Sequence, residues 1–207
     1  MTGFHESAAF DDGEFDGIRH SEGLRHPFSL PSGLGATAVR RCETGGVRDE
    51  HHYRVSTLWT GDRGTGTSGY RDYDRAVTLR VEGKPDLLGS SDRPFRGDPT
   101  RWNPEDLLLA ALSECHLLSY LHACVTAGVV VTSYEDDAAG TMVLDGKGGG
   151  AFREVTLHPR VTVADPAMIP AAEAAHRQAR EWCFIANSVN FPVHHEATVT
   201  AAAPHES

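Results

Sequence analysis

Apolar residues between positions 53 and 89 follow the spacing of short strands. Residues 53–59 alternate between apolar and polar side chains, which is the pattern of a half-buried strand. Residues 73–82 predict a second strand, whose valine and leucine side chains at alternate positions share one face. Residues 90–102 are rich in proline, glycine and aspartate, and they predict a loop. The first part of the domain is therefore expected to be β-structure.

A long helix is expected after this loop, from residue 104 to about residue 127. Asn103 is a good N-cap, and Pro104 suits the first helical position. Glu105 and the aspartate after it favour the positive end of the helix dipole, and Gly128 is a natural stop. Apolar residues cover nearly the whole circumference. This distribution is typical of a central, buried helix.

The remaining pattern predicts strands, a second helix and a last strand. Strand segments are expected at 129–131, at 140–144 and, most clearly, at 152–164. A helix is predicted over 171–182, and a final strand over 196–203. The order of strands, long helix, strands, helix and strand favours an α+β fold over a βαβ fold with a parallel sheet.

Composition limits the class of protein further. Residues 1–50 show neither the two-residue period of a strand nor the 3.6-residue period of a helix. We therefore expect a poorly ordered extension before a domain that spans 51–207. The chain has 207 residues and a net charge of −10, so non-specific binding to nucleic acid or anionic membranes is not expected. We see no apolar run long enough for a membrane span, and no signal peptide at the N-terminus. These features predict a cytoplasmic protein.

Four cysteines carry the candidate chemistry: Cys42, Cys115, Cys124 and Cys183. None forms a Cys-x-x-Cys pair, which argues against a structural zinc site. Cys124 lies nine residues after Cys115, on roughly the opposite face of the helix, and is expected to be an inert core thiol. The adjacent histidines at 194–195 would point to opposite faces of a strand, so we expect no shared metal ion. The other thiols are either inert or redox-active.

Three motifs resemble the OsmC/Ohr family of thiol peroxidases, and they are nearest to its OsmC-like branch. Residues 103–108 read Asn-Pro-Glu-Asp-Leu-Leu, residues 110–115 read Ala-Ala-Leu-Ser-Glu-Cys, and residues 176–183 read His-x-x-Ala-x-x-x-Cys. The resemblance covers residues 51–203. It implies antiparallel sheets around a long central helix, an intertwined homodimer, and active sites at the subunit interface. It also implies reduction of organic hydroperoxides without haem, flavin or metal.

The resemblance implies a role for each cysteine of a reactive pair. Cys115 would attack the peroxide as a thiolate and become a sulfenic acid. Cys183 would resolve that acid as a disulfide, which an external dithiol then reduces. Cys115 lies about three turns into its helix, where the helix dipole is too weak to stabilise a thiolate. A cation from outside the helix is therefore required.

In the family that cation is an arginine held by a glutamate. Glu105 matches the glutamate, and Arg96 is the favoured arginine; the alternatives are Arg63, Arg71, Arg93 and Arg101. Glu105 lies ten residues before Cys115, about 15 Å along a straight helix. Either the helix breaks after Glu105, or Glu105 serves the cysteine of a partner subunit.

Two features depart from the common family pattern. Many relatives have proline after the second cysteine, whereas this chain has Phe184, which leaves the pose of Cys183 open. Trp182 and Phe184 would either shield the Cys183 sulfur or simply pack in the core. His116 follows Cys115, but adjacent helical residues point about 100° apart, so we expect His116 to pack elsewhere. The alternative functions are a non-enzymatic small-molecule binder or a redox sensor and, more remotely, a zinc protein.

Overall fold

The computed structural model describes residues 50–203. The extension predicted for residues 1–50 falls outside this part except for Glu50, and Cys42 falls outside it as well. Both expectations therefore stay predictions.

An antiparallel sheet of three short strands comes first. It consists of β1 (Ser56–Trp59), β2 (Val77–Arg80) and β3 (Leu87–Gly89), paired in the order β1-β2-β3. The first two strands lie within the predicted ranges but are shorter, and the third was not predicted. Within residues 50–203, these strands pack mainly against one another, and every residue of β1 is exposed.

The loop after this sheet leads into the long helix α1 (Pro104–Thr126) through a short 3₁₀ helix, η1 (Arg93–Phe95). The Asn103 side chain accepts a hydrogen bond from the Asp106 N–H at 2.7 Å, which is the expected N-cap. Gly128 has a φ of 69°, a left-handed conformation that glycine adopts at little cost, and it ends the helix as predicted.

Burial of α1 differs from the expectation of a helix covered on all sides. Leu112, Tyr120 and Cys124 are fully or almost fully buried, whereas Val125 is 79% exposed and Leu118 is 59% exposed. By length and apolar composition alone, α1 would qualify as a membrane-spanning helix, although no run of this kind was expected from the sequence. One face of α1 packs inside the chain, and the other presents apolar side chains outward.

Two further sheets contain the remaining strands: β4 (Val131–Asp136), β5 (Ala139–Leu144), β6 (Gly150–Leu157), β7 (Pro159–Val163), β8 (Val193–His195) and β9 (Thr198–Ala201). Their orders are β4-β7-β9 and β5-β6-β8. Both sheets are mixed, because β6 pairs with β8 and β7 with β9 in parallel. The α+β class is confirmed; the expected antiparallel pairs are present in both sheets, and each sheet also contains one parallel pair.

The single strand predicted over residues 152–164 is also wrong. The chain leaves the strand pattern at His158, whose backbone N–H donates to Asp136 Oδ1 at 2.7 Å. Pro159 follows and has no N–H to continue the pairing. The segment therefore becomes β6 and β7, which belong to different sheets.

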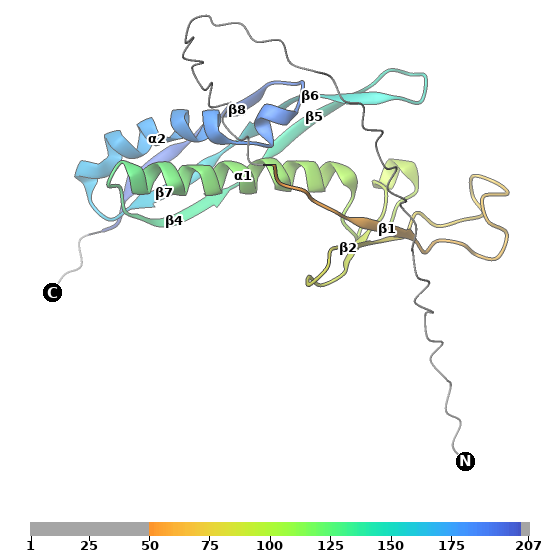
Figure 1. The fold of residues 1–207 in the computed structure, drawn as a ribbon. Coiled ribbons are helices and arrows are strands. Elements are labelled where there is room, and N and C mark those ends of the chain that lie inside the picture. The colour runs from red at the N-terminus through yellow and green to blue at the C-terminus, as the bar shows by residue number, and fades with distance from the viewer. Residues whose placement is uncertain (1–49, 204–207) are drawn as a thin grey trace, which may run out of the picture. The chain divides into compact units, whose positions relative to one another are not determined.

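The second helix, α2 (Ile169–Trp182), runs alongside α1 (Figure 1). It follows a 3₁₀ turn, η2 (Pro166–Met168), and the 3₁₀ turn η3 (Ala186–Ser188) comes after it. Small side chains such as Ala172 and Ala179 let α2 approach Tyr120 of α1, and Val161 and Val163 of β7 complete this core. The packing of α2 on α1 brings the end of α2 close to the middle of α1.

Candidate active site

The two cysteines named from the sequence meet where α2 ends. Cys115 lies in the middle of α1 and is partly exposed. Cys183 directly follows the last residue of α2 and is 1% exposed. The two thiols are neighbours, close enough for Cys115 to affect the pKa of Cys183, and both are free. Cys124 is buried away from them in the helical core, as expected for an inert thiol.

Burial determines the protonation state of Cys183. Burial is the main cause that raises the pKa of this thiol to about 11. The neighbouring Cys115 contributes to the increase, and the N–H groups of Ala186 and Ile185 oppose it. A protonated Cys183 can donate its S–H to the Cys115 sulfur. The burial of Cys183 therefore suits a resting pair in which Cys183 keeps its proton.

The turn after Cys183 sets the pose that the sequence left open. The Ala186 N–H points at the Cys183 sulfur, with a nitrogen–sulfur distance of 3.4 Å. Phe184 is 79% exposed, so it neither shields the sulfur nor packs in the core within this chain. Trp182 is partly exposed and packs edge-on against His122 of α1, with ring centroids 5.2 Å apart.

The structure leaves the expected glutamate and arginine apart. α1 is continuous from Pro104 to Thr126, so the alternative of a helix break after Glu105 is excluded. Glu105 Oε2 is buried and has no hydrogen-bond partner among residues 50–203. Arg96 is exposed, and its guanidinium forms no ion pair or hydrogen bond with another described residue. Within one chain, these two residues do not form the predicted pair.

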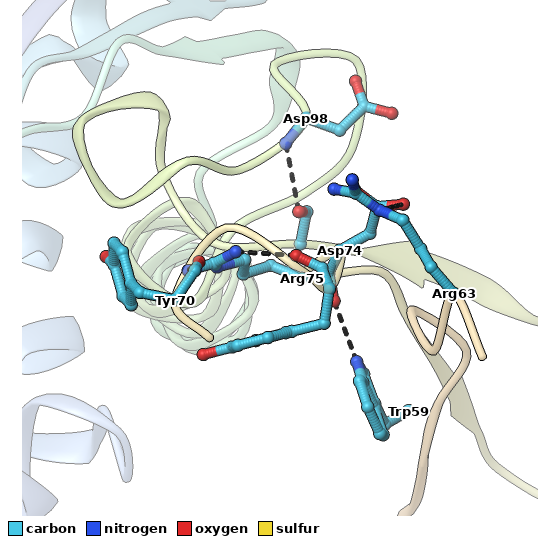
Figure 2. A network of polar contacts seen from close by, with 8 residues as sticks. Trp59, Arg63, Tyr70, Asp74, Arg75 and Asp98 are labelled. Carbon is cyan, nitrogen blue, oxygen red and sulfur yellow. Dashed lines mark hydrogen bonds and ion pairs between the residues drawn. The ribbon is translucent and has the colours of Figure 1, made fainter. Parts of the chain in front are cut away.

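Figure 2 shows how two arginines of the β1–β2 connection are held. Arg63 binds both carboxylate oxygens of Asp74, with nitrogen–oxygen distances of 3.0 and 2.6 Å. Arg75 is half-buried, and its guanidinium lies over the rings of Tyr70 and Tyr73, at 4.4 and 4.2 Å from their centroids. It also donates to the backbone carbonyls of the same two tyrosines, at 2.8 and 2.7 Å.

Arg75 was missed by the sequence analysis. No carboxylate within the described residues forms an ion pair with it, so its charge is fixed in position but not neutralised by a salt bridge. The signal that could have found it is the spacing Tyr-x-x-Tyr-x-Arg over residues 70–75, which puts two aromatic rings near one cation.

A buried histidine cluster lies beside the thiols. His116 Nε2 and His176 Nδ1 form a hydrogen bond of 3.1 Å. The ring centroids of His116 and His195 lie 4.2 Å apart. Tyr120 stacks on His176 with ring centroids 4.0 Å apart. His116 is fully buried and hydrogen-bonded to His176, in agreement with the expectation that it packs elsewhere than on Cys115.

Burial keeps this cluster neutral. Desolvation lowers the pKa of His116 to about 3, and it lowers those of His176 and His195 to about 4. No group of three histidine, cysteine or carboxylate side chains suited to a metal ion occurs among residues 50–203. The cluster therefore consists of neutral, partly unpaired imidazoles.

Comparisons with known proteins agree on one family. The sequence model of the OsmC-like proteins matches residues 97–198. An OsmC-like protein of unknown function from Vibrio cholerae has a similar structure: the identity is 28%, the TM-score is 0.64, and the match covers 72% of this chain and 100% of that one. No protein in the curated set matches this chain.

Two more distant structures share the fold. One is an organic hydroperoxide resistance protein, OsmC, from Legionella pneumophila, at 16% identity and a TM-score of 0.52, covering 75% of this chain and 100% of that one. The other is the organic hydroperoxide resistance protein OhrB of Bacillus subtilis, at 17% identity and a TM-score of 0.52, covering 72% and 98%.

Proposed function

The chain belongs to the OsmC-like family, and from that membership we propose that it is a cysteine-based peroxidase that reduces organic hydroperoxides. The family fold supports a peroxide-related or redox role. The observation that carries the finer proposal is the contact between the Cys115 and Cys183 thiols at the junction of α1 and α2. The proposed protein is a cytoplasmic enzyme that needs no cofactor.

The proposed reaction begins at Cys115. Its thiolate attacks the distal peroxide oxygen, so a sulfur–oxygen bond forms and the oxygen–oxygen bond breaks. The alkoxide that leaves takes up a proton and becomes an alcohol. Cys115 becomes a neutral sulfenic acid, so its negative charge no longer raises the pKa of Cys183.

Cys183 completes the turnover in the proposal. Its sulfur attacks the sulfenic sulfur of Cys115, a disulfide forms, and the hydroxide leaves with the thiol proton as water. An external dithiol then reduces the disulfide to the two starting thiols. Because Cys183 is almost fully buried, it is protected from direct attack by peroxide and is available mainly to its neighbour.

Activation of Cys115 is proposed to require a second subunit. The outward face of α1 carries exposed Leu118 and Val125, and the first sheet exposes Leu58 and Trp59, so a second copy of the chain would bury apolar surface that one chain leaves open. We expect a homodimer of twice the 22.4 kDa chain mass by light scattering. A monomer with full activity would contradict this part of the proposal.

Glu105 is proposed to act across that interface. Its buried, unpaired oxygen would hold an arginine against the partner's Cys115, with Arg96 as the first candidate and Arg75 as the second. Glu105→Gln and Cys115→Ser homodimers should each be nearly inactive. In an equal mixture about half of the dimers should be heterodimers with one complete site each, so the mixture should regain about a quarter of wild-type activity. Absence of recovery in verified heterodimers would place Glu105 in its own subunit's site.

Turnover of cumene hydroperoxide with a dithiol such as dihydrolipoamide tests the proposed function. We expect catalysis that is lost in Cys115→Ser and retained in the matched control Cys124→Ser, which changes the buried thiol outside the pair. Slow oxidation of the wild type without turnover would instead support the redox-sensor alternative. Arg96→Lys and Arg75→Lys, compared in the same assay, identify the activating arginine.

A further inference from the structure

Asn187 caps the C-terminal end of α2 with two hydrogen bonds, one to a residue before Cys183 and one to Cys183 itself. The last carbonyl groups of a helix have no partner within the helix. The Asn187 side-chain Nδ2 donates to the carbonyl of Glu181 at 2.9 Å, and its backbone N–H donates to the carbonyl of Cys183 at 3.0 Å. One residue thus ties the turn to the helix before the cysteine and to the cysteine itself.

These two Asn187 hydrogen bonds help to position the backbone N–H of Ala186. Ala186 directly precedes Asn187, and its N–H lies 3.4 Å from the Cys183 sulfur. Ser188 stabilises the turn internally, because its hydroxyl donates to the carbonyl of Phe184 at 2.7 Å. The Asn187 side-chain amide connects the turn back to the body of α2 at Glu181. Phe184 allows a backbone freedom here that a proline would restrict.

We propose that Asn187 is the positioning residue that fixes the Cys183 sulfur toward Cys115. The role of Asn187 in peroxide reduction rests on the proposed function. Its role in bringing the two thiols together does not, because they can form a disulfide without peroxide. Asn187 acts before the sulfur–sulfur bond forms, by restricting the directions available to the Cys183 side chain. Asn187 does not take part in the bond changes. It contributes by raising the effective concentration of the Cys183 thiol near the Cys115 sulfur.

The equilibrium between the thiol pair and glutathione measures that effective concentration directly. Two protein thiols and one oxidised glutathione give the protein disulfide and two reduced glutathiones, so electrons balance without peroxide. Asn187→Ala should lower the equilibrium constant about tenfold, since it removes the side-chain tie to Glu181. Asn187→Asp should lower it at least as far, because a carboxylate presents only acceptors to a carbonyl.

Gln178→Ala is the matched control. Gln178 also carries an amide near this end of α2, but it donates to the side-chain carboxylate of Glu181 and not to its carbonyl. We expect the equilibrium constant of this variant to stay within about twofold of wild type. Asn187 is exposed, so its substitutions remove no core packing. Wild-type equilibrium constants in both Asn187 variants would overturn the proposal.

A single-turnover experiment with the full-length protein separates this proposal from the proposed function. With one equivalent of cumene hydroperoxide, Asn187→Ala should oxidise Cys115 at the wild-type rate but form the disulfide about tenfold more slowly. Dimedone would then trap the accumulated sulfenic acid. A variant that slows both steps equally would indicate a general structural role and refute positioning. If the wild type does not react with peroxide, the peroxidase proposal fails, and the glutathione equilibrium alone decides the role of Asn187.

Discussion

The buried histidine cluster makes the stability of the fold sensitive to mild acid. His116, His176 and His195 are neutral when folded, with pKa values of about 3, 4 and 4, whereas an exposed histidine titrates near pH 6.5. Between these values the unfolded chain binds more protons than the folded chain. Stability therefore falls as the pH decreases below about 6.5, and the loss is complete only below the folded pKa values.

The size of this loss follows from the pKa differences. At pH 5 each unfolded histidine is almost fully protonated, while each folded one is almost neutral, which costs about 2 kcal/mol per group. The three together give about 6 kcal/mol, a large share of the roughly 5–15 kcal/mol that stabilises a typical domain. Exposed carboxylates with lowered pKa values, such as Asp74 and Asp98, titrate only below about pH 4 and do not contribute in this window.

Urea unfolding at pH 7.5 and pH 5.0, at one protein concentration and with the thiols reduced, measures this difference. His195→Phe replaces one titrating ring in the cluster with a ring of similar shape. It should reduce the loss between the two pH values by about 2 kcal/mol. His194→Phe makes the same change at the exposed neighbouring position and serves as the matched control. Equal stability of the wild type at both pH values, or the same pH dependence in His195→Phe as in the wild type, would refute this reasoning.

Three further predictions concern the scaffold and the chemistry. Leu112→Ala removes a fully buried side chain from the core between α1 and β6, and should lower the free energy of unfolding by about 2–5 kcal/mol; the exposed Leu144→Ala should change it little. Asn103→Ala removes the N-cap bond of α1 and should cost about 1 kcal/mol in the same urea assay. Dialysis against EDTA should leave hydroperoxide turnover unchanged, because the proposed reaction takes place on two thiols; loss of activity that zinc restores would contradict this.

Local signals in the sequence predicted the helices better than the sheets. Asn103, Pro104 and Gly128 mark the ends of α1 through chemistry that acts over one turn, so both ends were placed correctly. The break at His158 depends instead on a hydrogen bond to Asp136, which is distant in sequence. Parallel pairing of β6 with β8 likewise brings together segments separated by α2, and alternation within one strand does not reveal its partner.

The candidate site shows the same division. The motifs around the two cysteines made Cys115 and Cys183 the candidates, and the packing of α1 on α2 brings them together, which the sequence spacing alone could not show. The histidine cluster was not foreseen, because His195 reaches it from β8 and His176 from α2. Arg96 was favoured for its place in the loop before α1, but its guanidinium forms no ion pair or hydrogen bond with the residues that the structure describes. The partner of Glu105 stays a prediction that only the assembled dimer can test.

Stopped-flow oxidation of the reduced protein by cumene hydroperoxide, followed by mass spectrometry of the thiols, tests the two-cysteine mechanism most directly. We expect rapid formation of one Cys115–Cys183 disulfide in the wild type, with the Cys115 sulfenic acid accumulating in Cys183→Ser and no rapid phase in Cys115→Ser. Slow oxidation distributed over all the cysteines, with no preference for Cys115, would contradict the proposed mechanism.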